Sequence, residues 1–224
     1  KGTKFERDGN GNIIVDASGN PLKTSTFERL GKGTPDFIMG LTNSFEYKGF
    51  KLTVVADYRY GASTWSEAKQ LLLFTGGDLE TTGFDRTQGY VVPGSVTTTG
   101  AVNTVPVGND PSYTGTLNYF TTNHRFVGES NVIDASAIKI RELALSYSLS
   151  KKLLGNSGIT AATFGVNARN PFVFLADGKL LKPKNGLANN GYGDPEANYS
   201  NGNSQGIMNV GQYPTTRSIG FSVN

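Results

Sequence analysis

The sequence YKGFKLTVVADYRYG, residues 47–61, alternates strictly between two kinds of side chain. Successive side chains of a β-strand point to opposite faces, so this stretch predicts a strand with two unlike faces. One face carries the apolar and aromatic residues Phe50, Leu52, Val54, Ala56, Tyr58 and Tyr60. The other face carries Lys51, Thr53, Val55, Asp57 and Arg59. The fold depends on which of these two faces meets water.

The residues before this stretch predict the first half of a hairpin. From Pro35 to Tyr47 the apolar residues again occupy alternate positions, and Gly, Thr, Ser and Glu stand between them. Lys48-Gly49 then fits a two-residue turn. We therefore expect two antiparallel strands, over residues 35–47 and 50–60.

Three further segments alternate in the same way, at 137–149, 159–169 and 215–224. Their polar positions in mid-strand are small and uncharged, as are those of the first strand (Thr42, Ser44, Ser146 and Ser148). Solvent-facing strand surfaces usually carry Lys and Glu instead. The sequence thus predicts about five long strands whose polar face is unlike an ordinary soluble surface.

The connections between these strands differ in length from one end to the other. Residues 48–49 and 150–158 are short connections, whereas 1–34, 61–135 and 170–214 are long and rich in Gly, Asn, Thr and Pro. Within them, 63–74 has helical spacing, with Ser63 or Ser66 as the N-cap. Outer-membrane barrels have short periplasmic turns and long extracellular loops. The pattern favours an all-β transmembrane antiparallel barrel over a soluble β-sandwich, whose strands also alternate.

The composition excludes several kinds of site. The chain has no Cys and a single His, which excludes thiol and His-cluster metal centres. The net charge is +3 and the basic residues are dispersed, so no nucleic-acid partner is indicated. No apolar run approaches the roughly 20 residues of a membrane helix.

His124 has no nucleophile motif near it, and we predict no enzyme activity. Because the chain begins at Lys1, we expect it to be part of a longer protein.

Five segments together resemble the C-terminal end of the SusC/RagA family, which are TonB-dependent outer-membrane transporters of Bacteroidetes-type bacteria. They are GTPDFIMGLTNSFEYKGFKLTVVADYRYG (33–61), ASAIKIRELALSYSLSKKLL (135–154), FGVNARNPFVF (164–174), YGDPEAN (192–198) and YPTTRSIGFSVN (213–224). Their order and spacing match over nearly all of residues 33–224. The resemblance implies a 22-stranded barrel with an N-terminal plug, of which this chain supplies about the last five strands.

The resemblance also implies a function. The family takes up oligosaccharides or peptides across the bacterial outer membrane, with a SusD-like surface lipoprotein above the barrel and TonB acting on the plug from the periplasm. The expected partners are thus the remainder of the barrel and plug, the lipoprotein, TonB and membrane lipid. Two alternatives stay open: a structural or secretion-associated barrel without a substrate, and a soluble carbohydrate-binding β module.

On this interpretation the chain divides into 1–34 (outer loop), 35–60 (hairpin), 61–135 (outer loop), 136–169 (hairpin), 170–214 (outer loop) and 215–224 (last strand). Lys51, Asp57 and Arg59 would face the lumen, in contact with the wall or the plug. Ten residues would face lipid: Phe50, Leu52, Val54, Ala56, Leu143, Leu145, Phe164, Val166, Ile219 and Phe221.

The loops carry candidates for ligand or partner contact, and each has a plainer interpretation. The aromatic residues Trp65, Tyr113, Tyr119, Tyr192 and Tyr199 are suited to stack on sugar rings or peptide side chains, but any one of them is more often loop packing. The sequence DPE (194–196) is interpreted as a structural loop rather than an acid–base pair. The sequence DGNGN (8–12) departs from a calcium loop at the sixth and twelfth positions, so we expect a turn. No cofactor is predicted; calcium is possible in the family but is not supported by these residues.

Overall fold

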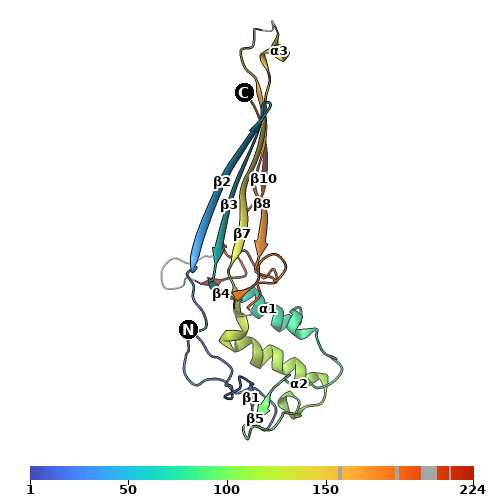
Figure 1. Cartoon of the computed structure of the whole chain (residues 1–224). Helices are drawn as coiled ribbons and strands as arrows, with labels where there is room; N and C mark the ends of the chain where they lie inside the picture. Colours follow the sequence, from blue (N-terminus) through green and yellow to red (C-terminus); the bar gives the residue numbers. More distant parts are fainter. Residues whose placement is uncertain (156–157, 185–186, 198–205, 212) are drawn as a thin grey trace. The chain divides into compact units, whose positions relative to one another are not determined.

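The computed structural model describes residues 1–155, 158–184, 187–197, 206–211 and 213–224. The chain forms two compact units (Figure 1). The first, called here the loop unit, comprises residues 1–32, 64–133 and 198–211. The second, called the sheet unit, comprises residues 33–63, 134–197 and 212–224. Each unit is built from segments that lie far apart in the sequence.

The sheet unit is a five-stranded antiparallel sheet with the strand order β10-β8-β7-β3-β2. Its strands are β2 (Phe37–Tyr47), β3 (Phe50–Tyr60), β7 (Ala137–Ser148), β8 (Thr163–Leu175) and β10 (Ser218–Val223). A short helix, α3 (Lys151–Leu154), lies in the connection between β7 and β8. Strand β8 begins later and runs further than the 159–169 expected, because Phe172 and Phe174 continue the alternation beyond Asn170-Pro171.

The β2–β3 hairpin turns at Lys48 and Gly49, whose φ angles are 48° and 88°. Two consecutive positive φ values match the type I′ turn that suits the twist of a two-residue hairpin. Gly49 also lies against the next strand, since a Cβ there would sit 2.8 Å from the carbonyl oxygen of Ser148. A glycine is therefore required both by the backbone angle and by the close approach of β7.

Strand β7 contains a β-bulge at Arg141. Val55 of β3 pairs with Glu142, but the next residue, Ala56, pairs with Ile140, so Arg141 is the extra residue. A bulge places two residues of one strand opposite one residue of its partner. As a result Ile138 and Ile140 lie on the same face as Leu143 and Leu145, although their spacing in the sequence would assign them to opposite faces.

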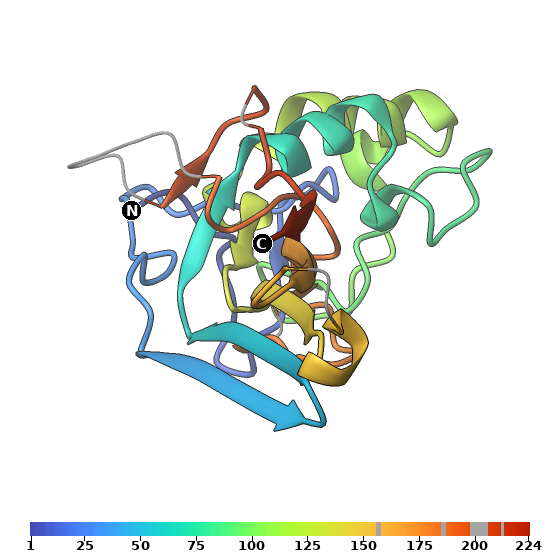
Figure 2. The ribbon, with the colours of Figure 1, turned by 90° about the horizontal axis from the view of Figure 1, so that it is seen from above.

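Residues 64–133 of the loop unit contain more regular structure than the one helix expected at 63–74. They contain α1 (Glu67–Thr75), α2 (Tyr113–Asn118), a π-helical turn η3 (Tyr119–Asn123) and the 3-10 turns η1 (Leu79–Thr81), η2 (Val107–Asn109), η4 (His124–Phe126) and η5 (Gly128–Asn131). Helix α1 packs against η3 and η4, and η3 continues directly from α2; α1 and α2 are seen in Figure 1, and Figure 2 gives the view from above. Five buried residues form the core there: Leu73, Val92, Val107, Tyr119 and Phe120.

Short strands complete this unit. Strand β1 (Ile14–Val15) pairs with β5 (Val96–Thr97), and β4 (Ser63–Ser66) lies between β6 (Val132–Asp134) and β9 (Ile207–Met208). The helix predicted over 63–74 is therefore shorter than expected. Residues 63–66 form strand β4, and helix α1 begins after Ser66. The Oγ of Ser66 accepts a hydrogen bond from the Lys69 amide at 3.2 Å, which identifies Ser66 as the N-cap. Gly76, at φ 74°, ends α1. Among the described residues, no helix has the length and apolar character to cross a membrane.

Candidate functional site

One face of the five-stranded sheet is apolar across all its strands. The register joins Leu52, Leu145, Val166 and Phe221 in one row, and Val54, Leu143, Ala168 and Ile219 in the next. All ten residues expected to face lipid lie on this face. Nothing in the described chain covers it: Phe221 is 81% exposed, Ile219 72% and Phe45 58%. An apolar face of this extent is far larger than the scattered apolar residues of a soluble surface.

Aromatic residues lie at both ends of the apolar face. At the end near the β2–β3 turn, the rings of Phe50 and Tyr147 are 4.4 Å apart. At the other end, Phe37 of β2 packs against Tyr58 and Tyr60, with ring centroids 5.3 and 5.4 Å apart. The positions between these two aromatic groups are mainly aliphatic. The face is therefore an apolar band with an aromatic border at each end.

The opposite face of the sheet is polar, as the alternation predicted. Near the β2–β3 turn, Lys51 pairs with Glu46 at 3.0 Å, and the hydroxyls of Ser44 and Thr53 are 3.0 Å apart. The three residues expected to face the lumen, Lys51, Asp57 and Arg59, all lie on this polar face of β3. The charges are concentrated toward the far end of the strands, where a group of ionic side chains gathers.

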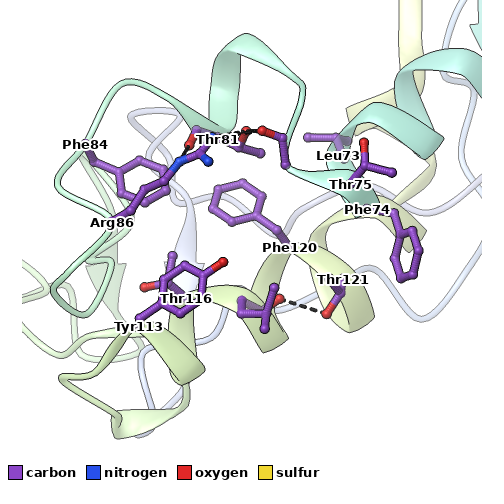
Figure 3. A pocket seen from close by; sticks show the side chains of 12 residues that line it. Leu73, Phe74, Thr75, Thr81, Phe84, Arg86, Tyr113, Thr116, Phe120 and Thr121 are labelled. Atoms are coloured by element: carbon purple, nitrogen blue, oxygen red, sulfur yellow. Dashed lines mark hydrogen bonds between the residues drawn. The ribbon is translucent and has the colours of Figure 1, made fainter.

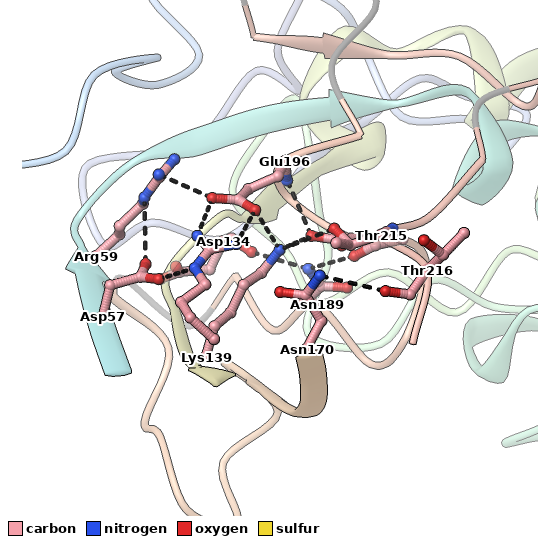
Figure 4. Close-up of polar contacts among 12 residues, drawn as sticks. Asp57, Arg59, Asp134, Lys139, Asn170, Asn189, Glu196, Thr215 and Thr216 are labelled. Atoms are coloured by element: carbon pink, nitrogen blue, oxygen red, sulfur yellow. Dashed lines mark hydrogen bonds and ion pairs between the residues drawn. The ribbon is translucent and has the colours of Figure 1, made fainter. Parts of the chain in front are cut away.

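This ionic cluster joins strands β3 and β7 to the segment that follows β8 (Figure 4). Lys139 is only 2% exposed, and its Nζ donates to Asp194 Oδ1 at 2.5 Å and to Glu196 Oε2 at 2.8 Å. Arg141 donates to both carboxylate oxygens of Glu196, at 2.7 Å for the Nη1–Oε2 pair. Arg59 Nη2 lies 2.8 Å from Glu196 Oε1. A single carboxylate in the segment is thus held by three cations of the sheet.

The cluster is balanced in charge. Arg141 Nε also donates to Asp57, so the cations Arg59, Lys139 and Arg141 face the carboxylates of Asp57, Asp194 and Glu196. Thr215, which precedes β10, donates through its Oγ1 to Asp194 Oδ2 at 2.5 Å. Buried charges persist only when they are paired and hydrogen-bonded. The arrangement neutralises itself, so its chemical role is to hold the segment against the sheet.

The environment lowers the pKa of both loop carboxylates. For Glu196 the hydrogen bonds from Arg141 dominate and, with those from Lys139, lower the pKa to about 2 despite partial burial. For Asp194 burial acts in the opposite direction, but hydrogen bonds from Lys139, Thr215 and the Glu196 amide lower the pKa to about 2. Both groups therefore stay ionised at neutral pH.

Sequence reasoning interpreted DPE as a structural loop but missed its partners, Lys139 and Arg141. A signal was present in AIKIRE (137–142), where apolar residues occupy the even positions until Ile140 and the odd positions from Leu143 onward. Such a change of phase indicates a bulge. Here it places the consecutive residues Arg141 and Glu142 next to the polar face.

The loop unit contains a pocket lined by aromatic rings, threonines and one arginine (Figure 3). The empty space at this site is ≈ 420 Å³, a volume that includes open solvent at the mouth of the pocket. Phe84 and Phe120 stack inside it, with centroids 5.7 Å apart and planes 6° from parallel. Phe74, Tyr113 and Leu117 line it as well and are 45%, 47% and 41% exposed. The pocket is thus a mostly apolar hollow with accessible walls.

His124 belongs to a network in the loop unit, not to a catalytic arrangement. Its Nδ1 lies 3.0 Å from the hydroxyl of Tyr119, and its Nε2 lies 2.9 Å from Glu80 Oε2. The other Glu80 oxygen pairs with Lys69 at 2.7 Å. Burial opposes ionisation of Glu80, but the His124 hydrogen bond and the Lys69 charge lower its pKa to about 2. The network joins α1, η1 and η4.

The aromatic candidates of the loops are in different environments. Tyr119 is 3% exposed and is a core residue, so it offers no surface to a ligand. Tyr113 lines the pocket. Trp65 is half-buried in β4 opposite Ile207, and Tyr192 is half-buried with its amide bonded to the carbonyl of Asn189. Tyr199 lies outside the described residues.

The DGNGN segment forms a turn closed by its own aspartate. Asp8 Oδ1 accepts hydrogen bonds from the amides of Asn10 and Asn12, and Oδ2 accepts one from the Asn12 side chain. Asp16 repeats this pattern with the amides of Ser18 and Asn20. Both carboxylates are occupied by local donors, as in an Asx turn.

No family model matches the chain, but individual proteins do. It is similar to TonB-dependent receptor P3 of Formosa agariphila, with 24% identity over 98% of this chain and 19% of the receptor. It is also similar to TonB-dependent receptor P39 of the same organism, with 26% identity over 75% of this chain and 14% of that protein. The chain therefore spans less than a fifth of the length of these curated relatives.

Solved structures share the fold. A structure of the RagAB peptide importer in its closed-closed state superposes with a TM-score of 0.54 at 17% identity, over 99% of this chain and 22% of the importer chain. Another structure of the RagAB peptide transporter gives 0.52 at 18% identity, over 99% and 22%. The antiparallel sheet thus aligns with a segment of a much longer chain. TonB-dependent receptors are a family of outer-membrane transporters, not enzymes, which agrees with the prediction from the sequence.

Proposed function

The chain is homologous to TonB-dependent receptors and shares the fold of part of the RagA importer, and on this basis we propose that it forms part of a TonB-dependent importer in the bacterial outer membrane. Its five strands would be about the last five of a 22-stranded barrel. The substrate would be an oligosaccharide or a peptide, carried across intact.

Within the structure, the observation that carries this proposal is the uncovered apolar face with its two aromatic borders. Phe50 and Tyr60 are ten residues apart on β3, a rise of about 33 Å along the strand. At the strand tilt of roughly 40° found in outer-membrane barrels, this becomes about 25 Å along the membrane normal, the height of the apolar band in such barrels. The aromatic rows would lie at the two membrane interfaces, and the aliphatic rows between them would contact lipid.

The polar face would then line the interior. Lys51 and the ionic cluster would belong to the inner wall, with Asp57 and Arg59 bound to a segment of the chain itself rather than to the plug. The edge strands β2 and β10 each pair with a single neighbour among the described strands. An open strand edge in lipid would leave backbone groups without hydrogen bonds. The remainder of the barrel would supply the missing neighbours.

The sidedness follows from the connections. Residues 48–49 and 150–158 would be periplasmic, and the loop unit together with the segment after β8 would lie outside the cell. A SusD-like surface lipoprotein would contact these outer segments, and TonB would act on the plug elsewhere in the whole protein.

Two measurements on the whole protein in its native host test the proposal. Membrane fractionation should place it in the outer membrane, and its electrophoretic mobility should change on heating, as that of a barrel does. Deletion of its gene should abolish uptake of one class of labelled oligosaccharide or peptide, and deletion of TonB should have the same effect. Recovery in the detergent-free soluble fraction would contradict the proposal and favour a soluble β module. Correct membrane assembly without any TonB-dependent uptake would favour a structural barrel.

A further inference from the structure

We propose that the aromatic pocket of the loop unit binds the C-terminal residue of a peptide, with an apolar side chain in the hollow and the free carboxylate on Arg86. The inference rests on the proposed function, because it assumes a cargo or ligand that reaches the outer loops. It adds the class of that ligand and the residues that recognise it.

The rings of the pocket favour an apolar occupant. Phe84 and Phe120 stack in parallel, and Phe84 also packs on Tyr90 at 4.4 Å, so these rings are fixed in place (Figure 3). Phe120 is 5% exposed and belongs to the core, whereas Leu117 at the wall is 41% exposed. A rigid apolar base with an accessible wall can take up a side chain without rearranging, which lowers the entropic cost of binding.

The threonines of the pocket offer little to a sugar. Thr121 Oγ1 donates to the carbonyl of Leu117 at 2.7 Å, and Thr81 Oγ1 donates to the carbonyl of Asp78 at 2.6 Å. The hydroxyl of Thr116 donates to the carbonyl of Gln88 at 3.2 Å, and that of Thr75 to the carbonyl of Leu72 at 3.3 Å. Their protons are all committed to backbone oxygens. An oligosaccharide needs both donors and acceptors around its hydroxyls, and these threonines would offer it acceptors only.

Arg86 supplies the one cationic group in the pocket lining. Its Nε donates to the Thr81 carbonyl at 2.8 Å, and its Nη2 donates to the Gly76 carbonyl at 2.8 Å and to Thr81 Oγ1 at 3.2 Å, so the guanidinium is held in place. Nη1 makes no hydrogen bond among the described residues. The neighbouring carboxylate of Asp85 is occupied by Thr87 and Gln88. A fixed guanidinium whose Nη1 is available to donate is suited to bind a carboxylate through a charge-assisted hydrogen bond. The juxtaposition of this cationic Nη1 with an apolar hollow matches the end of a peptide chain.

The test uses the whole transporter, purified in detergent, and a short fluorescent peptide that ends in leucine with a free carboxylate. Leu117→Glu should weaken binding by about tenfold or more, because it places a charge in the apolar wall and repels the carboxylate. The matched control is Leu79→Glu, since Leu79 is 69% exposed on the same unit but does not line the pocket. This control should change affinity by less than about twofold.

A second arm tests the carboxylate. The same peptide with a C-terminal amide should bind the unmodified protein about three- to tenfold more weakly than the acid. Arg86→Gln should remove this difference between acid and amide, whereas Arg29→Gln, at another exposed arginine of the loop unit, should preserve it. Equal binding of acid and amide by the unmodified protein would overturn the inference, and so would equal effects of Leu117→Glu and Leu79→Glu.

Failure of this inference is distinguishable from failure of the proposed function. All variants should reach the outer membrane with heat-modifiable mobility, because the changes lie in the loop unit. A protein that assembles there but binds the peptide equally in all variants refutes only the pocket. A protein that is not in the outer membrane refutes the importer itself.

Discussion

The ammonium group of Lys139, in the middle of the sequence, lies 2.5 Å from the carboxylate of Asp194, 55 residues further along the chain. Lys139 is on strand β7 and Asp194 is in the segment after β8, and both side chains are almost fully buried. The pair and its neighbours hold that segment to the polar face of the sheet.

Removal of the Lys139 charge should destabilise the whole protein. Lys139→Met leaves Asp194 without its cation, and the loss of one partner of a buried ion pair costs about 3–5 kcal/mol. Denaturant unfolding in detergent micelles measures the change. Lys51→Met is the matched control, because the Lys51–Glu46 pair is exposed and contributes less than about 1 kcal/mol. Equal losses in the two variants would contradict a special role for the cluster.

The stability supplied by the cluster should depend on pH in the acid range. The pKa values of Asp194 and Glu196 are lowered to about 2 in the folded protein, below the roughly 4 of unfolded carboxyl groups. The stabilisation is therefore complete above about pH 4–5 and is lost as the pH falls toward 2. Unfolding free energies measured between pH 7 and pH 2.5 should show this decline. The double variant Asp194→Asn, Glu196→Gln should be less stable at pH 7 and decline less; an unchanged slope would argue against these two groups.

The two faces of β3 should respond oppositely to a new charge. Val54→Arg places a cation on the apolar face at mid-strand, which costs about 2–4 kcal/mol in an outer-membrane barrel. Thr53→Arg, one residue earlier, places the same charge on the polar face and should assemble normally. The amount of heat-modifiable protein in the outer membrane compares the two. Equal assembly of both variants would mean that the apolar face does not contact lipid.

The β2–β3 turn should tolerate no side chain at Gly49. Gly49→Ala forces a Cβ into a left-handed conformation and against the Ser148 carbonyl, so we expect a loss of about 1–3 kcal/mol. Gly40→Ala, in strand β2, meets no atom within 4 Å and serves as the control. Refolding yield into detergent or lipid vesicles, followed by the heat-modifiable band, distinguishes the two. A normal yield for the Gly49 variant would show that the turn can change its conformation.

The aromatic residues of the loops show the limit of sequence reasoning about a site. Tyr113 and Tyr119 are six residues apart and look equivalent in the sequence, yet Tyr113 lines an accessible pocket and Tyr119 is buried against His124. The spacing within 63–74 indicated the helix that became α1, but the turn-forming residues after it gave no sign of α2 and η3, which pack around Leu73 and Phe120. Nothing in the sequence around Arg86 indicated a role in a site. That role depends on the carbonyl groups of Gly76 and Thr81, which fold around its guanidinium.

The sequence by itself determined which side chains share a face of each strand. The alternation in β2, β3, β8 and β10 is a local property of extended backbone, and every residue expected on the apolar face lies there. Tertiary structure decided the rest. The pairing of β7 with β3 introduced the bulge at Arg141. The bulge puts Ile138 on the same face as Leu143, and it pairs Lys139 with Asp57 of β3. The ionic cluster exists only because folding joins β3, β7 and the segment after β8, and opposite charges so far apart in a sequence interact only when the chain brings them within a few ångströms.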